Sequence, residues 1–210
     1  MRLISHNFED GADFPAEFAF ATTHPTHHIS LSADRNPHLA WSGIPAGTKS
    51  LALICHDPDV PSRLDSLNKE GDELPAAVPR VTFYHWLLLD IPPAMREIAA
   101  GSQSNGIVPK GKAGPEAPGG LRHGVNDFTK WFANDAEMAG DYYGYDGPCP
   151  PWNDALPHHY IFTLYALDTP CLEIDGPLNG ENVEASLEAH VLAQASLTGV
   201  YSLNPTLHRN

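Results

Sequence analysis

The chain has 210 residues, of which 42% are apolar and 18% charged, so it is neither disordered nor fibrous and can bury a real core. Its 17 glycines and 20 prolines predict many turns and argue against a helical bundle. Its net charge is −14 and no basic stripe is visible, so we expect no nucleic acid partner.

Cysteine usage and apolar runs bear on the compartment. Cys55, Cys149 and Cys171 are odd in number and widely spaced, which argues against a disulfide framework or a zinc knuckle. The longest apolar runs, such as residues 51–55, are far shorter than a membrane span. The N-terminus has no apolar signal region. These features favour a cytoplasmic protein without an integral membrane span.

In chain order, the sequence predicts four strands. Residues 50–56 form an apolar run that should end at the turn residues Asp57-Pro58, and residues 81–91 form a second run that prolines stop. Residues 160–168 form a third, and a short strand is expected at residues 199–202. Because the long runs are apolar on both faces, we expect central strands that are covered on both sides.

One helix is predicted from about residue 182 to residue 195, since Val183, Leu187 and Val191 recur at helical spacing. Long loops are expected at residues 62–80 and 101–147. Few helices and several strands predict a mainly β fold, built as a single domain over residues 1–210.

Three stretches at predicted strand ends could carry chemistry, and each has a structural alternative. In the first, Asp57 and Asp59 flank a proline and Pro61 follows, so a stiff turn presents two carboxylates. The alternative is a turn whose carboxylates accept hydrogen bonds from nearby backbone N–H groups. In the second, His85 lies in an apolar strand and needs a partner. The alternative is a core histidine bonded to a backbone carbonyl.

The third stretch comprises the proline-rich residues 147–151 and the His-His-Tyr run that follows. His158 and Tyr160 should share one strand face, and His159 should point to the other. A stiff loop with surface histidines is the alternative here. If the three strand ends converge, they form a pocket of carboxylates, imidazoles and a phenol. Such a pocket suits a phosphate-like anion or the head group of a zwitterion.

Several ordered blocks give the chain a resemblance to a known family. They are residues 36–41 (NPHLAW), 44–53 (IPAGTKSLAL), 57–63 (DPDVPSR), 85–86 (HW), 90–92 (DIP), 124–128 (GVNDF), 145–151 (YDGPCPP), 157–160 (PHHY) and 165–168 (YALD). In this order the blocks resemble the phosphatidylethanolamine-binding protein (PEBP) family, and most closely its bacterial branch of Raf-kinase-inhibitor-like proteins.

The resemblance implies a large antiparallel β-sheet packed with a smaller β-sheet, plus a few helices. It implies a binding protein for small anionic or phosphorylated ligands, including phospholipid head groups, with no cofactor and no metal. It also implies a homodimer. The family's pocket residues match Asp57, Asp59, Pro61, His85, Gly147, Pro148, His158 and Tyr160.

The sequence departs from the family pattern around this pocket. His159 stands where arginine is usual, which removes a permanent cation. Residues 129–145 look expanded and acidic, and the loop at residues 62–80 is long. We expect these differences to reshape the mouth of the pocket. Asn36 also stands where serine is common.

Three other functions stay open at this point. A hydrolase would use a His/Asp pair as general base or Cys149 as nucleophile, although no Gly-x-Ser-x-Gly motif is present. A metal site would use His24, His27 and His28, whose spacing fits no ligand signature. Inhibition of a kinase or a protease is suggested by the family name alone.

Overall fold

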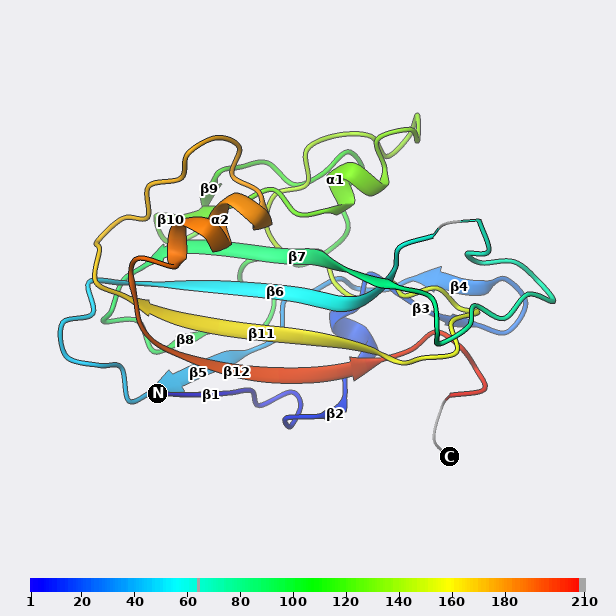
Figure 1. The fold of residues 1–210 in the computed structure, drawn as a ribbon, viewed down its shortest axis with the longest axis horizontal. Helices are drawn as coiled ribbons and strands as arrows, with labels where there is room; N and C mark the ends of the chain where they lie inside the picture. The colour runs from blue at the N-terminus through cyan, green and yellow to red at the C-terminus, as the bar shows by residue number, and fades with distance from the viewer. Residues whose placement is uncertain (64, 208–210) are drawn as a thin grey trace.

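The computed structural model describes residues 1–63 and 65–207 of the chain (Figure 1). In chain order its elements are β1 (Arg2–Ile4), β2 (Ala12–Asp13), the 3-10 turn η1 (Ala16–Phe18), β3 (Ala21–His24), β4 (His28–Leu31), β5 (Leu39–Ser42), β6 (Ser50–Pro61), β7 (Arg80–Ile91), β8 (Glu97–Ile98), β9 (Glu116–Ala117), β10 (Leu121–His123), α1 (Phe128–Trp131), β11 (His158–Leu167), α2 (Gly180–Leu187) and β12 (Val191–Tyr201).

The large sheet has the strand order β2-β12-β11-β6-β7-β10-β9 among the described residues. Its pairings are antiparallel, except that β2 runs parallel to β12 at Gly199 and Val200. A smaller sheet has the order β1-β5-β8, and β3 and β4 form a separate hairpin. The arrangement confirms the predicted fold class of a large antiparallel sheet accompanied by a smaller one.

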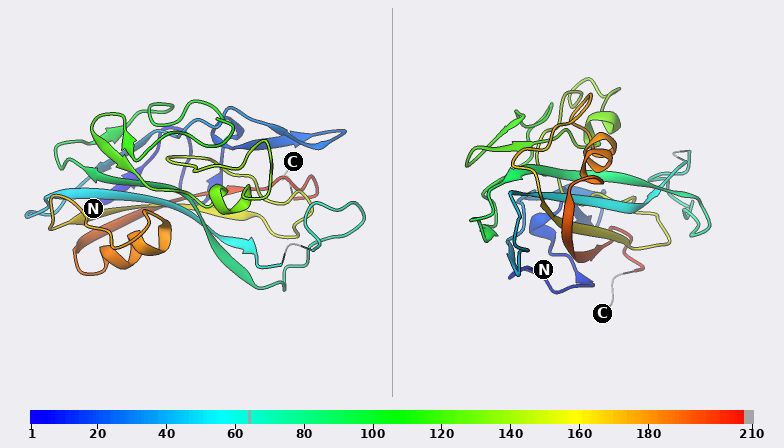
Figure 2. Two further views of the ribbon diagram at one scale, coloured as in Figure 1. Left: turned by 90° about the horizontal axis from the view of Figure 1, so that it is seen from above. Right: turned by 60° about the vertical axis from the view of Figure 1, so that its left-hand side comes forward.

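Both faces of the central strands are covered, as the apolar runs predicted. On β6, the buried Leu53 packs with Trp86 of β7 in one core cluster. The next residue, Ile54, packs with Val183 and Leu187 of α2 in a second cluster. Figure 2 shows α2 on one face of the sheet, with the β3–β4 hairpin and the segments around β9 and β10 on the other. No helix among the described residues is long and apolar enough to cross a membrane.

The predicted helix is wrong in its second half. α2 begins where the side chain of Asn179 accepts a hydrogen bond from the backbone N–H of Asn182, and it ends at Leu187. β12 starts at Val191 and continues to Tyr201, so the short strand predicted at residues 199–202 is the end of a longer one. Pairing along the whole of β11 outweighs the helical spacing of Val183, Leu187 and Val191.

The strand ends also differ from the prediction. β6 does not stop at the Asp57-Pro58 turn but runs on to Pro61, and β11 begins two residues early, at His158. The predicted loop at residues 101–147 contains β9, β10 and α1. These short elements hold the long connection against the sheet and bring its last part to the candidate site.

Candidate functional site

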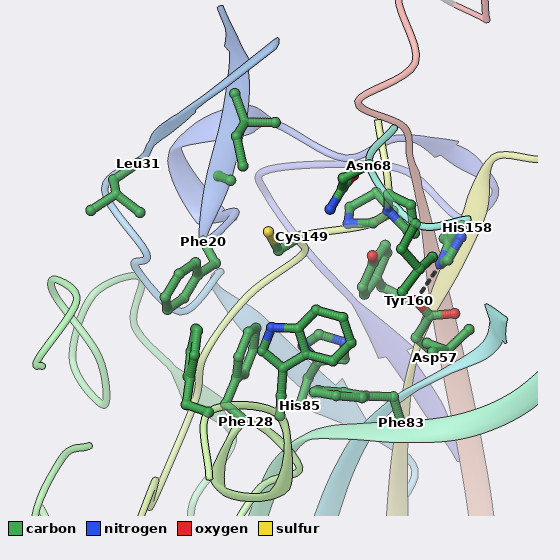
Figure 3. Close-up of a pocket in the computed structure, with 18 of the residues that line it drawn as sticks. Phe20, Leu31, Asp57, Asn68, Phe83, His85, Phe128, Cys149, His158 and Tyr160 are labelled. Carbon is green, nitrogen blue, oxygen red and sulfur yellow. Dashed lines mark hydrogen bonds and ion pairs between the residues drawn. The ribbon is translucent and has the colours of Figure 1, made fainter. Parts of the chain in front are cut away.

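A cavity of about 340 Å³ opens where β6, β7 and β11 meet the β3–β4 hairpin (Figure 3). Four of the eight predicted site residues line it, namely Asp57, His85, His158 and Tyr160. Most of the remaining lining is apolar and comes from β3, β4, β7, α1 and the segments at residues 132–138 and 149–151. The structure therefore brings together residues from the three stretches whose convergence the sequence left open.

A β-bulge turns His85 toward this cavity. His56 pairs with Tyr84, and Cys55 pairs with Trp86, so β7 has one extra residue at this point. Tyr84 packs on the α2 face of the sheet, whereas Trp86 packs on the opposite face. The bulge thus places His85 and Trp86 on the same side, a local change of aim that bulges produce near binding sites.

A second bulge lies at the DPD stretch. Asp57 pairs with Phe83, and Val60 pairs with Val81, so β6 carries one extra residue between them. The Asp57 carboxylate accepts a hydrogen bond from the backbone N–H of Asp59 at 2.7 Å. Pro58 has no N–H to donate, which suits a position where the ladder is interrupted. Pairing resumes after the bulge, and this is why β6 does not end where the sequence predicted.

His158 belongs to a buried chain of alternating charges. Its Nδ1 lies 2.7 Å from Asp57 Oδ2, and its Nε2 lies 3.2 Å from Asp154 Oδ2. Asp154 also accepts two hydrogen bonds from the guanidinium of Arg80, at 2.5 and 3.1 Å. The His158 side chain is fully buried. Both of its ring nitrogens are committed to protein carboxylates, so it has no donor left for a ligand.

The charge of His158 follows from these partners. Burial lowers its pKa, but the negative charges and hydrogen bonds of Asp57 and Asp154 outweigh burial and raise the pKa to about 9. Burial likewise raises the pKa of Asp154, yet the hydrogen bonds from His158 and Arg80 bring it below its ordinary value. At neutral pH the chain from Asp57 to Arg80 contains two cations and two anions, and its formal charges cancel.

His85 is buried under different conditions. Its Nδ1 lies 2.8 Å from the backbone carbonyl of Asp146. Because a carbonyl only accepts, Nδ1 carries the hydrogen. Burial lowers the pKa of His85, despite opposing contributions from Asp57 and from the Asp146 carbonyl. The ring is therefore neutral at pH 7, and Nε2 is an acceptor with no hydrogen-bond partner among residues 1–63 and 65–207.

Aromatic side chains hold the His85 ring in place. Tyr160 and Phe128 pack edge-to-face against it, with ring centroids at 5.1 and 5.6 Å, and Phe83 lies at 4.8 Å. Burial, and then the negative charge of Asp57, raise the pKa of the Tyr160 phenol well above its ordinary value. Its hydroxyl stays protonated. The base of the cavity thus combines a neutral imidazole acceptor with a phenol that can donate.

Four predicted residues do not line the cavity. Asp59 Oδ2 accepts hydrogen bonds from the backbone N–H of His159 at 2.9 Å and from its Nδ1 at 2.8 Å, on the exposed side of the sheet. Pro61 ends β6 beyond the bulge. His159 lines a separate open cleft beside β2 and β12. The replacement of arginine by His159 was expected to remove a cation from the pocket, but this side chain lies away from the cavity. Ligand contacts of Asp59 and Pro61 stay predictions.

Gly147 and Pro148 serve the frame of the cavity. The Gly147 N–H donates to Asp34 Oδ1 at 2.7 Å, and a Cβ at this position would lie 2.1 Å from the carbonyl oxygen of Phe18. Only glycine fits there. The carbonyl of Pro148 accepts the N–H groups of Phe20 and Ala21. Their contact with a ligand also stays a prediction.

A buried lysine anchors the same segment from below. Lys112 Nζ lies 2.9 Å from Asp34 Oδ2 and 2.5 Å from Asp146 Oδ1, and it also donates to the carbonyl of Tyr145. Asp146 is the residue whose carbonyl accepts from His85. Lys112 therefore helps to fix the carbonyl that selects the His85 tautomer.

Several of these residues were not found from the sequence. Arg80 lay at the end of a predicted exposed loop, although it stands immediately before an apolar strand. Asp154 and Asp146 flank the proline-rich segment, and their closeness in sequence to His158 and Gly147 could have marked them as site residues. No sequence feature marks Lys112, because it lies in a glycine-rich stretch far along the chain from the other site residues.

The structure gives little support to a cysteine nucleophile or to a metal site. Burial, and then the charge of Asp34, raise the pKa of the Cys149 thiol to about 12, so the thiolate needed for nucleophilic attack is scarce at neutral pH. Within residues 1–63 and 65–207, no three potential ligands lie close enough together to hold a metal ion. His24 Nδ1 accepts backbone N–H groups of Thr26 and His27, and His28 stacks on Trp152.

A family model described as phosphatidylethanolamine-binding protein matches residues 4–202. The chain belongs to the phosphatidylethanolamine-binding protein family. Among curated relatives, it is 30% identical to the UPF0098 protein YbhB of Escherichia coli, over 96% of this chain and 100% of that protein. It is 32% identical to a UPF0098 protein of Methanothermobacter thermautotrophicus, over 96% and 98% of the two chains.

Solved structures agree with this assignment of the PEBP family. The crystal structure of Escherichia coli YbcL, described as a new member of the mammalian PEBP family, matches with a TM-score of 0.67 and 27% identity over 96% of this chain and 97% of that one. A putative PEBP homologue of Chlamydia trachomatis matches in fold with a TM-score of 0.62. These names are not names of enzymes.

Proposed function

We propose that this PEBP-family protein binds a small molecule through an anionic head group of the phosphate or carboxylate type, and that it does so without catalysis. The observation that carries the proposal is the free Nε2 of His85 at the base of a cavity that Asp57, Tyr160 and apolar side chains enclose. A nitrogen left unpaired in such a place is available to a ligand.

The electrostatics of the base support an anionic ligand despite the net charge of −14. The carboxylate of Asp57 is compensated by His158, and Asp154 is compensated by Arg80. The Tyr160 hydroxyl, whose pKa is raised in part by a hydrogen bond to Asp57, can exchange this carboxylate for an oxygen of the anion. His85 can accept the hydrogen of a singly protonated phosphate, or can itself take up a proton when a doubly charged anion arrives.

Cys149 makes a cysteine hydrolase the weaker proposal, because its thiol is held protonated. His158 is equally poor as a general base, since its raised pKa keeps it protonated and both of its nitrogens are occupied. Inhibition of a kinase or a protease stays a prediction from the family name.

Histidine-resolved NMR titration tests the proposal. Near pH 6.5, phosphate and O-phosphoethanolamine should produce saturable shifts at His85, with smaller shifts at His158. The variant His85→Ala should lose binding. The matched control His190→Ala removes an exposed histidine that pairs with Asp168 and should bind as the wild type does. Unchanged affinity in His85→Ala would overturn the proposal.

A further inference from the structure

The cavity is much larger than its polar base. A volume of about 340 Å³ falls in the range of pockets that hold drug-sized molecules, and it far exceeds the space that a phosphate ion needs. Figure 3 shows Asp57 and Tyr160 toward one side of the cavity and Phe20 and Leu31 toward the other, with His85 between them. The anionic head therefore fills only part of the cavity, and the rest must be matched by another part of the ligand.

Aromatic rings in mutual contact form one part of the apolar lining, and aliphatic side chains and prolines form the rest. Phe20 stacks on Phe128 with centroids 4.7 Å apart, and Phe128 stacks on Phe132 at 5.6 Å. Phe83 meets Phe128 edge-to-face at 5.2 Å. Phe128 in turn contacts the ring of His85. The aromatic wall, defined as Phe20, Phe83, Phe128 and Phe132, thus adjoins the polar base through the contacts of Phe83 and Phe128 with His85. Figure 3 shows Phe20, Phe83 and Phe128 of this wall.

Two large apolar side chains stand exposed at the same cavity. Leu31, at the end of β4, is 67% exposed, and Trp131, at the end of α1, is 45% exposed. Both belong to the cavity lining. Trp131 and Phe132 come from the stretch at residues 129–145 that looked expanded in the sequence. Exposed apolar groups that gather at a pocket mark a surface that a ligand covers.

We propose that the aromatic wall and Trp131 bind a planar aromatic substituent of the ligand whose anionic head lies against His85 and Tyr160. The inference rests on the proposed function and narrows it to aryl phosphates or aryl carboxylates. Continuity of the wall with the polar base places both groups of one molecule within a single cavity.

An aromatic ring suits this wall better than a flexible chain does. Flat rings gain from offset-stacked and edge-to-face contacts with phenylalanine and tryptophan. An alkyl chain of similar area loses rotational freedom when it is bound. The rings of the wall are themselves fixed by mutual stacking, so they need no reordering to receive a ring.

Calorimetric titration of the wild-type protein with methyl phosphate, phenyl phosphate and hexyl phosphate tests the inference. Phenyl phosphate should bind about tenfold more tightly than methyl phosphate and more tightly than hexyl phosphate. Equal affinity for methyl and phenyl phosphate would overturn the aromatic subsite and leave the proposed function intact. A hexyl gain as large as the phenyl gain would overturn the preference for a ring. Absence of binding by all three would overturn the proposed function itself, and the inference with it.

Single substitutions test whether the higher affinity for phenyl phosphate comes from the aromatic wall and Trp131. Trp131→Ala should reduce the affinity for phenyl phosphate about threefold to tenfold and leave that for methyl phosphate unchanged, whereas Trp131→Phe should retain most of the gain. Leu31→Ala is compared with the control Leu192→Ala, which removes a 43% exposed leucine from β12. Only Leu31→Ala should weaken phenyl phosphate. A loss shared equally by both phosphates in Trp131→Ala would contradict the assignment.

Discussion

The two buried histidines of the site, His158 on β11 and His85 on β7, differ in their hydrogen-bond partners and in their charge. His158 lies between the carboxylates of Asp57 and Asp154, and its pKa is raised to about 9. His85 has one carbonyl partner, that of Asp146, and burial lowers its pKa. The His158 ring is charged and hydrogen-bonded through both nitrogens within the protein, whereas the His85 ring is neutral and its Nε2 is free to bind a ligand.

The comparison teaches that hydrogen-bond partners, more than burial, decide the role of a histidine. Burial opposes the charged form in both rings. Two carboxylates overcome this cost at His158 but also consume both ring nitrogens. A single neutral carbonyl does not overcome it at His85. The residue that is free to meet a ligand is therefore the one with the poorer set of protein contacts.

The largest effect is expected from removing a carboxylate of the His158 chain. Asp154→Ala leaves the cations of His158 and Arg80 without their shared partner in a buried setting. The free energy of unfolding should fall by about 3 to 5 kcal/mol, as when one member of a buried ion pair is removed. Urea titration at pH 7 measures the loss.

Asp168→Ala provides the matched control, because Asp168 pairs with His190 at the surface. An exposed pair of this kind contributes at most about 1 kcal/mol. Similar losses in Asp154→Ala and Asp168→Ala would mean that the buried chain is not the charged structure described here.

The pH dependence of stability should separate the two histidines. A pKa raised from 6.5 to about 9 gives His158 a stabilising contribution that is fully present below pH 6.5 and is lost as the pH rises through 9. Its full size is roughly 3 kcal/mol, since each pKa unit corresponds to about 1.4 kcal/mol. His85 acts in the opposite direction, because its lowered pKa makes stability fall as the pH drops below 6.5.

Urea unfolding of the wild type and of His158→Gln between pH 6 and pH 10 measures this contribution. The difference in unfolding free energy between the two proteins should shrink as the pH rises through 9. A difference that is the same at every pH would show that His158 carries no raised pKa.

The pH dependence of ligand affinity should test His85. An anion that stays ionised between pH 6 and pH 8, such as a carboxylate, raises the pKa of His85 when it binds, so its binding takes up a proton and strengthens as the pH falls toward 6. The gain is at most about tenfold per pH unit, which corresponds to about 1.4 kcal/mol. Calorimetry in two buffers of different ionisation enthalpy counts the proton. Affinity that does not change between pH 8 and pH 6 would argue against His85 as the contact.

The smallest effect is expected at the third imidazole of the region, His159. It pairs with Asp59 on the exposed side and lines a different cleft. His159→Arg restores the residue that is usual in the family, yet it should change phosphate affinity and stability by less than about 0.5 kcal/mol. A marked gain in affinity would place His159 at the pocket after all.

Much of the fold could be predicted from the sequence because it depends on local patterns of apolar residues. The apolar runs around Leu53, Leu88 and Leu164 predicted the three central strands and their burial on both faces. The helical spacing of Val183, Leu187 and Val191 misled for the opposite reason. The pairing of β12 with β11 is a long-range contact, and the residues around Val191 contain no pattern that predicts it.

The site was readable only in part for a related reason. Asp57, His85 and His158 stood out as polar residues beside apolar strand ends. The bulge that aims His85 was invisible, since a strand that is apolar on both faces shows no alternation to interrupt. Arg80 and Lys112 reach the site through tertiary contacts, and residue type alone could not assign them there.

The most direct test of the contrast is the protonation state of the two rings, read from ¹⁵N chemical shifts of the histidine side chains at pH 7.5. His158 should be an imidazolium with both nitrogens protonated, and His85 should be neutral with its hydrogen on Nδ1. A neutral His158, or a charged His85 in the ligand-free protein, would contradict the account.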